Sequence, residues 1–89
     1  MKKYKLLDMG TSLPRREFNT EDIERIMLKY FENDNNIVED YEVVEFSQEL
    51  KLNNDQLAFA TKLLSENKEV YVISRNDKFV AIAACRRIE

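Results

Sequence analysis

Apolar residues after Asn19 recur every three or four positions, a spacing that predicts an amphipathic helix ending near Asn33. Asn19 is a good N-cap, because its short side-chain oxygen can accept a hydrogen bond from the first turn. Phe18 and Ile23 stand at the two positions of a hydrophobic staple. The stripe expected to face the core consists of Ile23, Ile26, Met27, Tyr30 and Phe31.

A second helix is predicted to begin at Asn53 and to end within residues 65–68. Asn53 is its N-cap, and Gln56 completes the pattern of a capping box. Leu52 and Leu57 are placed for a second staple. The inner stripe is expected to consist of Leu57, Ala60 and Leu64, widened by Phe59 and Leu63.

The C-terminal part predicts a β-hairpin. Residues 69–75 are rich in β-branched and aromatic side chains, Asn76 and Asp77 are turn formers, and residues 78–85 form the returning strand. The returning strand is apolar on both faces, which is typical of a central strand that is covered on both sides. Its small residues fall on one face, where a helix can approach closely: Ala81, Ala83 and Cys85.

The remaining segments are less regular. Residues 3–8 predict a short strand, and residues 9–16, which hold the only glycine and the only proline, predict a loop. The composition of residues 41–47 favours a strand. A helix stays open as the alternative there, since some apolar residues of the segment also have helical spacing: Ile37, Tyr41 and Val44.

These elements follow one another in the order β-α-β-α-β-β. We therefore expect residues 1–89 to form a single α+β domain, with two helices packed on one face of a small sheet that ends in the C-terminal β-hairpin. The core is expected to include Ile26, Met27, Tyr30, Leu57, Leu64, Val72 and Ile82.

The sequence also indicates in which cellular compartment the protein is expected. The N-terminal residues are basic, but no apolar run follows them, so no signal peptide is predicted. The sequence has no apolar run long enough to span a bilayer. A single cysteine cannot form an intramolecular disulfide, and we expect Cys85 to pack in the core. An intracellular, cytoplasmic protein with no membrane association is the resulting prediction.

The residue inventory argues against several kinds of chemistry. The chain has no histidine and one glycine, which leaves no Cys-His or Ser-His-Asp arrangement and no glycine-rich phosphate loop. The acidic residues after the first helix do not match a calcium loop, because the required glycine and ligand spacing are missing. We expect no catalytic residues, no metal site and no cofactor.

The charge is segregated along the chain. Residues 17–55 hold twelve acidic and three basic side chains, and residues 30–50 hold seven acidic side chains and no basic one. Ordinary surfaces mix both signs, so unmixed carboxylates indicate either a solvating face or a surface for a basic partner. The candidate partner-binding residues are Asp34, Glu39, Asp40, Tyr41, Glu42, Glu45 and Glu49. Tyr41 would add an apolar contact to the carboxylates, and Phe46 is expected to provide a further one.

The leading hypothesis is a non-enzymatic protein-interaction module. It would be a small acidic inhibitor or regulator that docks on a basic, nucleic-acid-binding surface of a larger protein, by analogy of size and charge with phage-encoded anti-defence proteins. The partner is then a protein, with no direct nucleic-acid binding, and the oligomeric state is left open. The second hypothesis is a small nucleic-acid-binding protein, which would use basic residues from both chain ends: Lys2, Lys3, Lys5, Arg15, Arg16, Arg86 and Arg87. The third hypothesis is a small enzyme that works without histidine.

Overall fold

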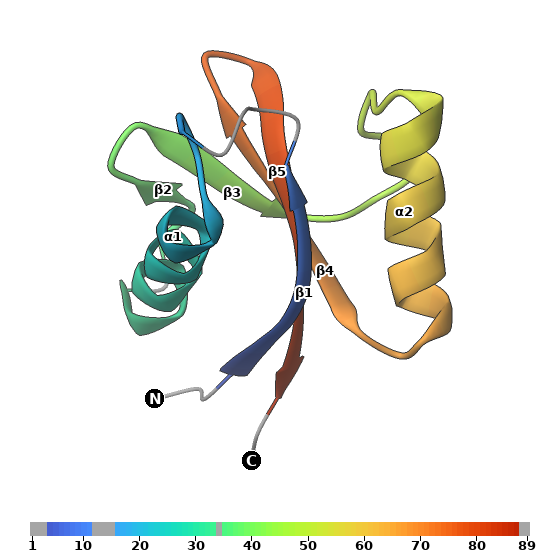
Figure 1. Ribbon diagram of the computed structural model, residues 1–89, viewed down its shortest axis with the longest axis horizontal. Coiled ribbons are helices and arrows are strands. Elements are labelled where there is room, and N and C mark those ends of the chain that lie inside the picture. Colours follow the sequence, from blue (N-terminus) through green and yellow to red (C-terminus); the bar gives the residue numbers. More distant parts are fainter. Residues whose placement is uncertain (1–3, 12–15, 34, 88–89) are drawn as a thin grey trace.

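A five-stranded antiparallel sheet stands between two helices in the computed structural model, which describes residues 4–11, 16–33 and 35–87 (Figure 1). The strand order is β1-β5-β4-β3-β2, so the first strand pairs with the last. The elements are β1 (Tyr4–Thr11), α1 (Thr20–Asn33), β2 (Ile37–Val38), β3 (Tyr41–Glu45), α2 (Asn54–Ser65), β4 (Glu69–Arg75) and β5 (Lys78–Arg87). The α+β class and the C-terminal hairpin are confirmed.

The two helices cover opposite faces of the sheet, and the predicted packing on one face is wrong (Figure 1). Successive residues of β4 alternate between two cores. Tyr71 and Ile73 pack on the α1 side, whereas Val70 and Val72 pack on the α2 side. Because β4 and β5 are apolar on both faces, a single helical layer would have left one of those faces in water.

Helix α1 begins and packs as predicted. The Asp22 backbone N–H donates to Asn19 Oδ1 at 3.1 Å, and the Asn19 N–H donates to Asp22 Oδ2 at 3.0 Å. Phe18 and Ile23 are both buried in the α1-side core, as a hydrophobic staple requires. The predicted stripe is confirmed, with Ile23, Ile26 and Met27 buried and Tyr30 and Phe31 half-buried against the same core.

Helix α2 has the predicted capping box but a different buried stripe. Asn53 Oδ1 accepts from the Gln56 N–H at 2.8 Å, and Gln56 Oε1 accepts from the Asn53 N–H at 3.0 Å. Ala60 and Leu63 are the buried residues of the helix, whereas Leu57 is 40% exposed and Leu64 is 44% exposed. The predicted core positions of Leu57 and Leu64 are therefore wrong.

Gly10 accounts for the way α2 is turned. A Cβ atom at Gly10 would lie 3.1 Å from Cε2 of Phe59, so the glycine leaves room for that ring against β1. Seating Phe59 there directs Ala60 and Leu63 at the sheet and rotates Leu57 and Leu64 outward. Gly10 lies within β1, which extends to Thr11 and replaces part of the loop that was predicted from residue 9.

The middle segment is a short hairpin, in which β2 and β3 enclose the two-residue turn Glu39-Asp40. The strand predicted over residues 41–47 is confirmed for Tyr41–Glu45, and the helical alternative is wrong. Asp40 consequently lies in the turn and not on a strand.

The β4–β5 hairpin turns at Asn76 and Asp77, as predicted. Both residues have positive φ, 53° and 62°, which suits a tight two-residue turn. Ala81, Ala83 and Cys85 all face the α1-side core, as expected from their spacing. Cys85 is fully buried, and burial, with a smaller effect of the nearby Glu69 charge, raises its pKa to about 12.

Candidate functional site

Three of the predicted acidic residues, Glu39, Asp40 and Glu42, gather at the corner of the sheet where the β2–β3 hairpin lies beside the β4–β5 turn. A surface hollow of about 240 Å³, which we call the acidic hollow, opens there. It is lined by Ile37, Glu39, Asp40, Tyr41, Glu42, Ser74, Asn76 and Asp77. The hollow thus brings together four of the seven predicted residues and adds a carboxylate, Asp77, from a segment more than thirty positions away.

Strand register sets the direction in which the hollow faces. Ile37 stands opposite Glu42 on β3, and Glu42 stands opposite Ser74 on β4. Directly opposed residues of antiparallel strands point to the same side of the sheet. Val44, two positions after Glu42, packs against the α2-side core. Ile37, Glu42 and Ser74 therefore face the α2 side.

Glu39 forms ion pairs with two residues of α1. Its Oε2 lies 3.1 Å from Arg25 Nε and 3.1 Å from Lys29 Nζ, and the hydrogen bonds from Arg25 and then Lys29 hold the pKa of Glu39 below its usual value. The residue adopts φ 57°, a left-handed conformation that non-glycine residues rarely take. Glu39 thus ties the β2–β3 turn to α1, and its charge is already balanced.

The other carboxylates of the hollow are not balanced in this way. Asp40, Glu42 and Asp77 are exposed, and no basic side chain of the described residues pairs with them. Within the part of the chain that the structure describes, no lysine or arginine lines the hollow. These three side chains can accept hydrogen bonds from an ammonium or guanidinium group of a partner.

Tyr41 does not supply the exposed aromatic contact that was predicted. It is half-buried on the α1 side, with its ring centroid 5.2 Å from that of Phe18. Arg75 covers it, with Cζ 5.5 Å from the ring centroid and Nη1 donating to the hydroxyl oxygen at 3.4 Å. Phe46, the other predicted aromatic contact, is half-buried against the α2-side core.

The exposed apolar contact at the hollow comes from Ile37, because 60% of its surface is exposed and it lines the hollow. Its backbone N–H donates to Asn35 Oδ1 at 3.1 Å. An edge strand normally offers such N–H groups to a strand of another chain, and the Asn35 side chain occupies this one. The corner is therefore suited to side-chain contacts more than to the addition of a strand.

Two predicted residues, Glu45 and Glu49, lie apart from the hollow. Glu45 stands opposite Tyr71, a residue of the α1-side core, and so lies on the other face of the sheet. Glu49 is exposed in the loop between β3 and α2. Asp34 falls outside the described residues.

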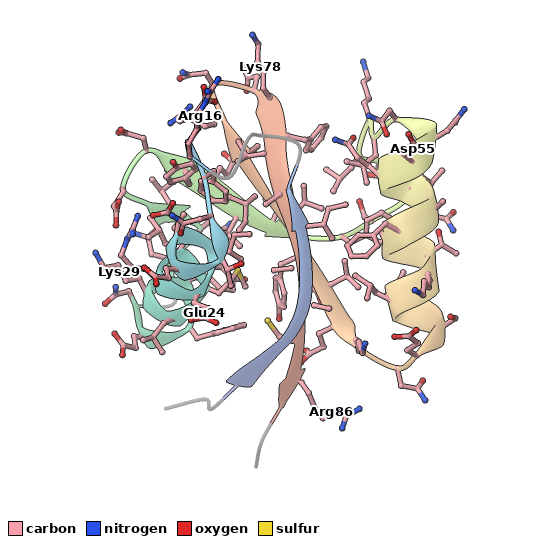
Figure 2. All side chains as sticks on the ribbon, viewed as in Figure 1. Arg16, Glu24, Lys29, Asp55, Lys78 and Arg86 are labelled. Atoms are coloured by element: carbon pink, nitrogen blue, oxygen red, sulfur yellow. The ribbon has the colours of Figure 1, made fainter. Side chains whose placement is uncertain are left out.

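The basic residues of the alternative hypothesis divide between two ends of the molecule. Figure 2 shows Arg16 near Lys78 at one end and Arg86 at the other. The backbone pairing of β1 with β5 places Lys5 opposite Arg86 and Tyr4 opposite Arg87. Strand pairing thus places Lys5 and Arg86 at the same end of the sheet, and Arg16 lies at the other end of the molecule. Lys2, Lys3 and Arg15 lie outside the described ranges.

Comparisons with protein-family models, curated proteins and solved structures gave no match. Within the described ranges, no group of three or more acidic or cysteine side chains is arranged to hold a metal ion. Neither α1 nor α2, the helices of the part described, has the length and apolar composition needed to cross a bilayer.

Proposed function

We propose that this protein is a non-enzymatic interaction module that docks its acidic hollow on a basic surface of a partner protein. The observation that carries the proposal is the convergence of Asp40, Glu42 and Asp77 around one hollow that no basic side chain of residues 4–11, 16–33 and 35–87 lines. Like charges held together repel one another, so a site of this kind gains most when a cationic group enters it.

The partner that fits this chemistry is a protein that presents arginine or lysine side chains, such as a nucleic-acid-binding surface. Covering that surface would compete with nucleic acid, which makes the protein a small inhibitor or regulator. The analogy with phage-encoded anti-defence proteins rests on size and charge alone. An intracellular location is part of the same proposal.

One observation favours a second candidate, a nucleic-acid-binding protein. The register positions of Lys5 and Arg86 are directly opposite on β1 and β5. Opposed like charges are unfavourable in a sheet, and a phosphate anion would relieve that cost. Arg16 lies at the opposite end of the molecule from Arg86 and does not belong to this pair.

The test compares two charge-reversal variants with the same change in net charge. One variant carries Asp40→Lys, Glu42→Lys and Asp77→Lys in the hollow. The control variant carries three reversals of exposed acidic residues elsewhere: Glu24→Lys, Glu32→Lys and Glu45→Lys. Fluorescence anisotropy measures the binding of both variants and of the native protein to a labelled nona-arginine peptide, at low and at physiological salt.

The hollow variant is expected to bind at least about tenfold more weakly than the control variant, and native binding should weaken as salt rises. Equal losses in the two variants would show that net charge, and not the hollow, attracts the peptide, which overturns the proposal. A gel-shift assay on DNA and RNA completes the test. Salt-sensitive binding that is lost in the Arg86→Glu variant would replace the proposal with the second candidate.

A further inference from the structure

A second depression lies on the same side of the sheet as the acidic hollow. This apolar groove, of about 300 Å³, lies between the first half of α2 and the start of β5. Phe79 and Ile82 of β5 and Phe59 of α2 provide apolar walls. The polar side chains beside them, Asn53 and Gln56, hydrogen-bond to the backbone in the capping box, so the groove offers mainly apolar contact.

The register of the sheet joins the groove to the hollow. Glu42 stands opposite Ser74, and Ser74 stands opposite Phe79, so the three residues form one row across β3, β4 and β5. Ser74 lines the hollow and Phe79 lines the groove. Neighbouring strands are about 4.8 Å apart, so roughly 10 Å separates the backbone of Glu42 from that of Phe79.

The hairpin directs its basic residues away from this row. Arg75 covers Tyr41 on the α1 side, and Lys78 stands opposite Arg75, so both point to the face opposite Ser74 and Phe79. On the far side of the groove the rim is again acidic, at Asp55, the residue labelled near the start of α2 in Figure 2. Among the described residues, no basic side chain lines the groove or the hollow.

We propose that the apolar groove and the acidic hollow form one bipartite site, which binds a segment of the basic partner carrying an aromatic or long aliphatic side chain about 10 Å from an arginine or lysine. The inference rests on the proposed function and specifies the partner's chemistry. The groove is at the small end of the range for ligand pockets, which suits one side chain better than a cofactor. Asp55 on one side of the groove and the carboxylates of the acidic hollow on the other favour a cationic flank over a neutral one.

The test uses the full chain, labelled with ¹⁵N, and three short capped peptides followed by NMR titration. The first peptide has a phenylalanine and an arginine separated by three glycines, a spacer that reaches about 13 Å when extended. The second replaces the phenylalanine by alanine, and the third replaces the arginine by glutamate. We expect the first peptide to shift the amide signals of Gln56, Ser74 and Phe79 and to bind about tenfold or more tightly than the other two.

The outcomes separate the two proposals. If the first and second peptides bind equally well at the hollow and the third does not, the acidic hollow acts alone, and the bipartite site is wrong while the proposed function stands. If no arginine peptide shifts the signals of the hollow, both proposals are overturned. If the third peptide binds as well as the first, charge has no part, and the bipartite site is again wrong.

A matched pair of variants checks the position of the cationic end. Glu42→Gln removes one carboxylate from the row, and Glu24→Gln removes one from the exposed outer surface of α1. The first variant should weaken binding of the phenylalanine–arginine peptide about threefold or more, and the second should leave it unchanged. Equal affinities in the two variants would place the arginine elsewhere and overturn the inference.

Discussion

Leu63 and Leu64 are adjacent leucines of α2 with opposite surroundings, and replacing each by alanine tests how the helix packs. Leu63 is fully buried, whereas Leu64 is 44% exposed. A leucine-to-alanine change removes three carbon groups, worth about 0.8 kcal/mol each when buried. For Leu63 this is about 2.4 kcal/mol before any cavity penalty, and such changes cost about 2–5 kcal/mol in protein cores.

The cost at Leu64 should be smaller for two reasons. About half of the side chain is already in water, which leaves roughly 1.3 kcal/mol of transfer free energy to lose. Solvent can also fill the space, so no closed cavity remains. The change in helix propensity is the same at both positions and cancels from the comparison. We therefore expect Leu63→Ala to destabilise the protein by at least about 1 kcal/mol more than Leu64→Ala.

Urea denaturation followed by far-ultraviolet circular dichroism measures both free energies of unfolding. A difference of 1 kcal/mol corresponds to about 4–8 °C in Tm for a domain of this size, so thermal unfolding gives an independent reading. Equal effects of the two changes, or a larger effect at Leu64, would refute the orientation of α2 and with it the rotation that we attribute to Gly10.

Three further predictions follow from local contacts. Asn53→Ala should lower the free energy of unfolding by about 0.5–2 kcal/mol, measured in urea, because it removes the side chain that caps α2. The Cys85 thiol, buried and with its pKa raised to about 12, should react with a disulfide reagent at pH 8 only after denaturant is added; rapid labelling of the native protein would contradict its burial. The pKa of Glu39 is lowered by Arg25 and Lys29, so its contribution to stability is present above the ordinary glutamate pKa and is lost as pH falls through the lowered value. Glu39→Gln should accordingly flatten the loss of stability below about pH 4.5 in acid titrations, and an unchanged slope would refute the role of this ion pair.

Features that depend on neighbouring residues were predictable from the sequence. Both N-caps and the β4–β5 turn form as expected, because a capping side chain reaches only two or three residues along the chain. The apolar residues on both faces of β5 correctly predicted a strand that is covered on both sides. The predicted packing of both helices on one face was inconsistent with this pattern, and the structure has one helix on each face.

The acidic hollow depends on the pairing of strands that are distant in the sequence, and the sequence pattern does not predict the register of that pairing. Asp77 was read only as a turn residue, and it reaches the acidic hollow because β3 pairs with β4 in a particular register. Ile37 was considered only for its helical spacing, although it is an exposed residue of the edge strand β2. Glu39 shows the opposite case, since its place in an acidic run concealed partners ten and fourteen positions earlier on α1.

The position of β5 between β1 and β4 has a consequence for how the protein is made. Translation produces β1 first among these elements, yet its strand neighbour in the sheet, as far as the structure describes the chain, is β5, which is the last of them to be produced. Until β5 has left the ribosome, the N-terminal strand has no hydrogen-bonding partner, and the inner faces of both helices lack part of the surface against which they pack. The nascent chain must therefore keep its apolar segments from aggregating until β5 is available, and completion of the sheet requires the closure of a very long loop between β1 and β5.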